Sequence, residues 1–116
     1  MKNAVLDFVS HLISISSELT EVYRQHIADQ GELMPHVLMG EVTRLVIANA
    51  GRAQAVWLPK LLQQLESGLS SGNDDIAELV AVSFVENLSG ENSAIQALLP
   101  AMGSTLRREV KLICGF

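Results

Sequence analysis

The chain has 116 residues and a net charge of −5, and 48% of its residues are hydrophobic but only 4% are aromatic. A chain of this length and composition forms one domain, residues 1–116, with a core large enough to be stable without cross-links. The negative charge argues against direct nucleic-acid binding and against docking on anionic lipid, because both depend on Lys and Arg. The single cysteine, Cys114, excludes an internal disulfide.

No stretch of the sequence approaches the roughly 18 uninterrupted apolar residues that cross a bilayer. Asp7 and His11 interrupt the apolar N-terminal segment, and no clear cleavage site follows it. These features predict a cytoplasmic protein without membrane association.

The N-terminal third predicts either one long helix that bends near Ser16 or two helices in series. Apolar residues recur at helical spacing over residues 5–15 and again over 19–27, with a run of serines between them. Asn3 is a candidate N-cap, and Gly31 is a candidate end of the helical region.

Two further helices are predicted, each with a proline near its start. Pro35 begins the first, Gly51 is its expected stop, and the interior Gly40 indicates close packing against a neighbouring helix. Pro59 begins or kinks the second, which ends near Gly68. The apolar stripe of the first comprises Val37, Leu38, Val42, Leu45 and Val46, and the leucine seam of the second comprises Leu58, Leu61, Leu62, Leu65 and Leu69.

Residues 74–88 are predicted to form the central helix of the fold. Asn73 is its expected N-cap, and Asp74 and Asp75 fall in the first turn, where negative charge is favourable. Apolar residues occupy nearly every face, which is typical of a buried helix. One face carries Ile76, Leu79, Val80, Ser83 and Phe84, and Val82 and Val85 add apolar surface elsewhere.

The C-terminal region predicts a turn over residues 89–93, an apolar segment up to Pro100 and a last helix. That helix has an apolar stripe of Met102, Leu106, Val110 and Ile113, and we expect Arg107, Arg108 and Lys111 to face water. No segment alternates apolar and polar residues for long enough to predict a strand. The predicted fold class is therefore all-α, a compact single-domain bundle of five or six helices.

No motif indicates catalysis, a metal site or a cofactor. His11, His26 and His36 are not spaced three or four residues apart, and one cysteine cannot supply a thiolate zinc site. Cys114 has basic neighbours that could lower the pKa of its thiol, but no residue is marked as its general base. We expect a protein that is not an enzyme and that needs neither metal nor cofactor.

Six carboxylates fall within residues 66–91, a window that contains no Lys or Arg. If Asp75, Glu78 and Glu86 share one edge of the central helix, they form a charged stripe, which Glu66 and the loop around Glu91 could extend and which could attract a basic protein partner. The alternative is an ordinary solvated helix face. The candidate partner-binding residues are Glu66, Asp74, Asp75, Glu78, Glu86 and Glu91.

The segments LMPHVLMGEVTRLV (residues 33–46), LLQQLESGL (61–69) and IAELVAVSFVENL (76–88) resemble a group of small all-helical bacterial proteins. That group is similar to the immunity proteins of polymorphic, contact-dependent toxin systems. The resemblance extends over about residues 30–90 and includes the SFVENL motif at Ser83–Leu88. It implies a cytoplasmic inhibitor that binds a cognate toxin domain and occludes its active site, and it assigns no contact residues.

A toxin that acts on nucleic acid has a basic cleft, which matches the negative charge of this chain. Two alternatives remain open. One is a helical adaptor or regulatory subunit, possible as a homodimer through the leucine seams, and the other is a small enzyme whose site has no recognisable motif.

Overall fold

The computed structural model describes residues 3–116, and every regular element in that range is helical. The elements in chain order are α1 (Ala4–Ile13), α2 (Ser17–Gln30), α3 (Pro35–Asn49), α4 (Leu58–Leu69), α5 (Asp74–Val80), the π-helical turn η1 (Ala81–Val85), α6 (Glu86–Leu88), α7 (Asn92–Leu98), the 3₁₀ turn η2 (Leu99–Ala101) and α8 (Ser104–Cys114). They form one body of 36 × 31 × 22 Å. The predicted all-α, compact architecture is confirmed.

The described chain contains more helices than the five or six predicted. The segments α5, η1 and α6 run on without a break, and we call them together the central helix; counted in this way, residues 3–116 form seven helices. The N-terminal region contributes two of them, because the backbone of Ser16 is extended and its Oγ accepts a hydrogen bond from the Leu19 N–H. The two helices in series are therefore present, rather than one bent helix.

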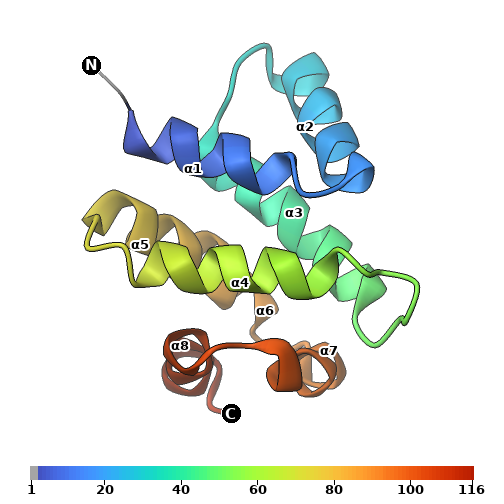
Figure 1. Cartoon of the computed structure of the whole chain (residues 1–116), viewed down its shortest axis with the longest axis vertical. Coiled ribbons are helices and arrows are strands. Elements are labelled where there is room, and N and C mark those ends of the chain that lie inside the picture. The colour runs from blue at the N-terminus through green and yellow to red at the C-terminus, as the bar shows by residue number, and fades with distance from the viewer. Residues whose placement is uncertain (1–2) are drawn as a thin grey trace.

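The central helix lies inside the bundle, as the sequence predicted. It packs against α1, α3, α4, α7 and α8. In Figure 1, α1 and α2 lie towards one end of the long axis and α7 and α8 towards the other, with α4 between them. Phe84, Leu79 and Leu88 are fully buried, whereas Val82 is 42% exposed. One side of the central helix therefore reaches the surface.

Local signals placed most helix ends correctly. Asn3 and Asn73 accept backbone hydrogen bonds at the starts of α1 and α5, and Gly31 ends α2 in the left-handed conformation. The predicted stop at Gly51 lies just past the end of α3. The helix ends at Asn49, Ala50 is its extended C-cap, and Gly51 follows in the left-handed conformation.

The apolar stripe of α3 is shifted from the prediction. Val37 is 40% exposed, while Met39, which the predicted stripe omitted, is buried. A Cβ at Gly40 would lie 3.4 Å from Asn87 Nδ2, an ordinary van der Waals distance, so the packing of α3 against the central helix does not require a glycine there. None of the helices within residues 3–116 is long and apolar enough to cross a membrane.

Candidate functional site on the central helix

The solvent-facing side of the central helix carries four carboxylates, which we call the acidic flank. Its residues, all exposed, are Asp74, Asp75, Glu78 and Glu86. Residues 3–116 contain one side-chain ion pair, Arg24–Glu21, and a hydrogen-bonded pair, His26–Glu41, and neither includes a carboxylate of the flank. The negative charge of the flank is therefore not neutralised by a neighbouring cation of the described chain.

A hydrogen bond between Ser83 and His36 joins the π-helical turn to the first turn of α3. Ser83 Oγ lies 2.5 Å from His36 Nδ1. Ser83 is only 6% exposed, which leaves its hydroxyl little access to a substrate. We interpret this bond as one that fixes the orientation of the imidazole.

The Ser83 carbonyl, in the π-helical turn, accepts hydrogen bonds from side chains. Asn87 Nδ2 donates to this oxygen at 2.7 Å. Thr43 Oγ1, on α3, lies 3.2 Å from the same oxygen and 2.7 Å from Met39 O. The Thr43 contact joins the middle of the central helix to α3, whereas the Asn87 contact lies within the central helix itself.

A cavity of about 210 Å³ opens beside the His36–Ser83 hydrogen bond, between α1, α3 and α5. Three of its lining residues are apolar and three are polar. The apolar residues are Val5, Pro35 and Leu79, and the polar ones are His36, Asp75 and Glu78. The structure thus places two of the predicted site residues, Asp75 and Glu78, together with a histidine that was not among them.

Glu66, in contrast, is engaged in the fold. Its Oε2 accepts from the Thr105 N–H at 3.0 Å and its Oε1 accepts from the Leu106 N–H at 2.7 Å. The carboxylate therefore caps α8, whose own N-cap residue, Gly103, has no side chain. Partial burial raises the pKa of Glu66, but these hydrogen bonds and the nearby charge of Arg108 outweigh it, so the net pKa is lowered.

Glu91 is exposed at the start of α7 and makes no side-chain cap there. The partner-binding role of all six carboxylates stays a prediction. The carboxylates of the acidic flank are free to contact a partner, whereas the Glu66 carboxylate is engaged in capping α8.

The other two histidines and the cysteine form no candidate catalytic or metal site. His26 is buried; its Nδ1 lies 2.8 Å from Glu41 Oε1, and its Nε2 accepts from the Met34 N–H at 3.0 Å. Burial raises the pKa of the Cys114 thiol, which is the opposite of the effect that its basic sequence neighbours suggested. His11 is exposed. No three His, Cys, Asp or Glu side chains among residues 3–116 are arranged to hold a metal ion.

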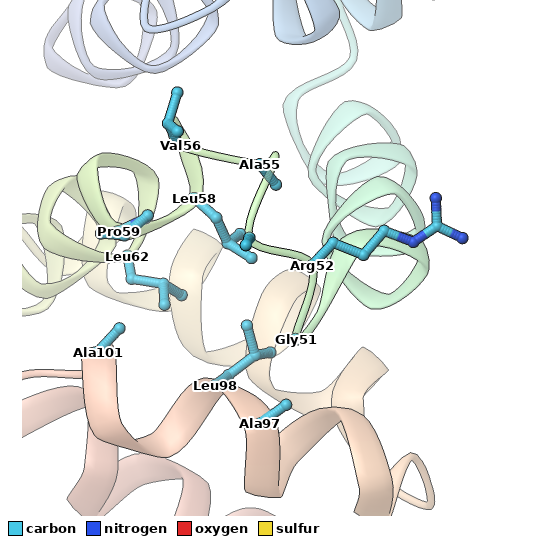
Figure 2. Close-up of a pocket in the computed structure, with 11 residues that line it drawn as sticks. Gly51, Arg52, Ala55, Val56, Leu58, Pro59, Leu62, Ala97, Leu98 and Ala101 are labelled. Atoms are coloured by element: carbon cyan, nitrogen blue, oxygen red, sulfur yellow. The ribbon is translucent and has the colours of Figure 1, made fainter.

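A second, more apolar cavity of about 430 Å³ lies between the loop of residues 50–57, α4 and α7 (Figure 2). Leu58, Leu62 and Leu98 contribute to its wall, and Arg52 is its one charged lining residue. In Figure 2 the Arg52 side chain extends away from the other lining residues. None of the predicted site residues lines this cavity, and its other side chains offer no polar group that would orient a ligand.

Residues 9–113 match the family model DUF7674, which is described as a domain of unknown function. The chain belongs to the DUF7674 family. No curated protein and no solved structure matches this chain. The matched range includes the acidic flank, the π-helical turn and every lining residue of the smaller cavity except Val5. The description of DUF7674 states no activity.

The predicted site residues did not include His36, Thr43 and Ser83, which link the central helix to α3. A signal was present, since each is a polar residue within an otherwise apolar helical stretch. Buried polar groups need hydrogen-bond partners. That rule indicates that Thr43 and Ser83 are paired, but it does not say with which residue.

Proposed function

We propose that this protein binds and neutralises a basic protein partner, as an immunity protein does for its cognate toxin, with the acidic flank placed over the active-site cleft of that partner. The observation that carries the proposal is the exposed row of carboxylates on the central helix, which no cation of the described chain neutralises. Charges of this kind contribute little to folding. They accelerate encounter with a partner of opposite charge.

Exposed apolar side chains next to the flank support a binding role. Val37 follows His36 in α3 and is 40% exposed, and Val82 precedes Ser83 and is 42% exposed. Stable interfaces combine apolar contacts that slow dissociation with charges that set the rate and orientation of encounter. The flank together with Val37 and Val82 offers both.

The rigidity of this surface also favours binding. Ser83 is tied through its side chain to His36, and through its carbonyl to Asn87 and Thr43. A surface that is already ordered loses less conformational entropy when it binds.

The proposal is tested by co-expression with the product of the adjacent gene and by reversal of flank charges. We expect a 1:1 complex that suppresses the toxicity of the partner. Replacing Asp74, Asp75 and Glu78 together with Lys should slow association at least about tenfold and weaken the dependence of the rate on salt.

A matched control reverses three exposed carboxylates of α2 and the turn that follows it, Glu18, Asp29 and Glu32. The control changes the net charge by the same amount on a different element. If the control and the flank variant associate equally fast, net charge and not the flank drives binding. Self-association without a toxin partner would favour the adaptor alternative.

A further inference from the structure

We infer that the cavity of about 210 Å³ beside the acidic flank receives one arginine or lysine side chain of the partner. The inference rests on the proposed function and specifies a contact within the same site. The lining of the cavity has two parts: apolar residues from α1, α3 and α5, and two carboxylates from one face of α5.

The lining matches the two parts of a long basic side chain. Arginine and lysine bury an apolar stem while they keep a charged head near water. Val5, Pro35 and Leu79 offer apolar surface to the stem. Asp75 and Glu78 are exposed, lie three residues apart on α5 and form no ion pair within residues 3–116, so they are available to the head.

The size and composition of the cavity argue against other occupants. Pockets for drug-sized ligands usually have volumes of about 300–1,000 Å³, and this cavity is smaller. His36, Asp75 and Glu78 line it, yet these residues are not arranged to hold a metal ion. A single side chain with a positive charge is the occupant that fits both the volume and the sign of the lining.

His36 favours arginine over lysine as that side chain. Its Nδ1 is held by Ser83, so the ring has a fixed orientation at the edge of the cavity. A planar guanidinium can stack on an aromatic ring and bind two carboxylate oxygens at once, whereas an ammonium group acts as a point charge. We therefore expect the cavity to bind an arginine probe more tightly than a lysine probe.

Titrations followed by NMR test the cavity without a partner protein. The probes are N-acetyl-arginine amide, N-acetyl-lysine amide and, as an uncharged analogue of similar length, N-acetyl-norleucine amide. We expect saturable shifts at Val5, His36 and Leu79 with arginine, and an apparent Kd at least about fivefold higher with norleucine. Shifts that do not saturate, that occur elsewhere or that are equal for norleucine would overturn the inference.

Two variants separate the shape of the cavity from its charge. Val5→Phe fills the cavity and keeps both carboxylates, and Leu6→Phe is its control, because Leu6 is exposed and does not line the cavity. Asp75→Asn with Glu78→Gln keeps the shape and removes the charge. We expect Val5→Phe and the neutral double variant to weaken arginine binding at least about fivefold, and Leu6→Phe to leave it unchanged. Equal binding by the neutral double variant and the unmodified protein overturns the inference even if Val5→Phe fails to fold.

The same variants distinguish a failure of this inference from a failure of the proposed function. If Val5→Phe binds the partner normally while reversal of the flank charges abolishes binding, the cavity is not the anchor but the proposed function holds. If the arginine probe occupies the cavity but no basic partner depends on the flank, the proposed function fails and the cavity remains a site for a basic side chain.

Discussion

Glu66 and the pair Asp75 and Glu78 belong to the same acidic stretch and lie on consecutive helices, yet their surroundings differ completely. The Glu66 carboxylate accepts two backbone hydrogen bonds from the start of α8. Within residues 3–116, the carboxylates of Asp75 and Glu78 accept no side-chain hydrogen bond and form no ion pair. Both residues line a cavity that opens to solvent. The same chemical group therefore holds two helices together at one place and is left available at the other.

The comparison separates charges that stabilise the fold from charges that are available to a partner. A carboxylate that satisfies two helix N–H groups contributes to the free energy of unfolding, because those donors would otherwise lose a partner. Exposed carboxylates without partners contribute little. Substitutions at the two places should therefore differ in their effect on stability.

The largest expected effect on stability is that of Glu66→Ala, which removes the cap of α8. We expect the free energy of unfolding to fall by about 2 kcal/mol, the range for a partly exposed charged acceptor of backbone hydrogen bonds. Glu78→Ala, the matched control on the flank, should change it by less than about 0.5 kcal/mol. Urea denaturation followed by circular dichroism measures both, and equal losses would show that the two places do not differ.

A smaller effect is expected for Gly103→Ala, which tests whether the capping geometry carries the stabilisation. A Cβ at Gly103 would lie 2.5 Å from Glu66 Cδ, so the carboxylate must move away from the α8 N–H groups. We expect a loss of about 1 kcal/mol in the unmodified protein.

In the Glu66→Ala variant the carboxylate that would clash with a Cβ at position 103 is absent. Adding Gly103→Ala should then lower the free energy of unfolding much less. A double-mutant cycle of the four proteins measures this coupling. Additive losses would mean that alanine at position 103 acts on the backbone and not through the cap.

The parts of the molecule that the sequence predicted are those decided by neighbouring residues. The caps at Asn3 and Asn73 and the start at Pro35 depend on backbone groups no more than a few residues away. The burial of residues 74–88 follows from apolar residues on nearly every face of one helix. Local patterns of this kind are visible in a single chain.

The parts that the sequence left out depend on residues far apart in the chain. Glu66 caps a helix that begins about forty residues later, and Ser83 binds His36 across 47 positions. The Ser83 carbonyl in the π-helical turn is contacted by Asn87 of the central helix and by Thr43 of α3, which lies forty positions earlier. No local rule predicts these pairings, so Glu66 and Glu78 appear equivalent in the sequence although the fold separates them.

The smallest expected effect is a pH dependence that belongs to Glu66. Its pKa in the folded state is lowered from the ordinary value, which is about 4.3 for glutamate. The charged carboxylate therefore stabilises the fold fully above that value, and the stabilisation is lost as the pH falls through the lower folded-state pKa. We expect the stability difference between the unmodified protein and Glu66→Gln to be constant from pH 7 to about pH 5 and to narrow below about pH 4. Urea denaturation at each pH measures it, with Glu78→Gln as the control that also loses one carboxylate. If the stability difference between the unmodified protein and Glu78→Gln narrows by the same amount below pH 4, the effect comes from net charge and not from the cap.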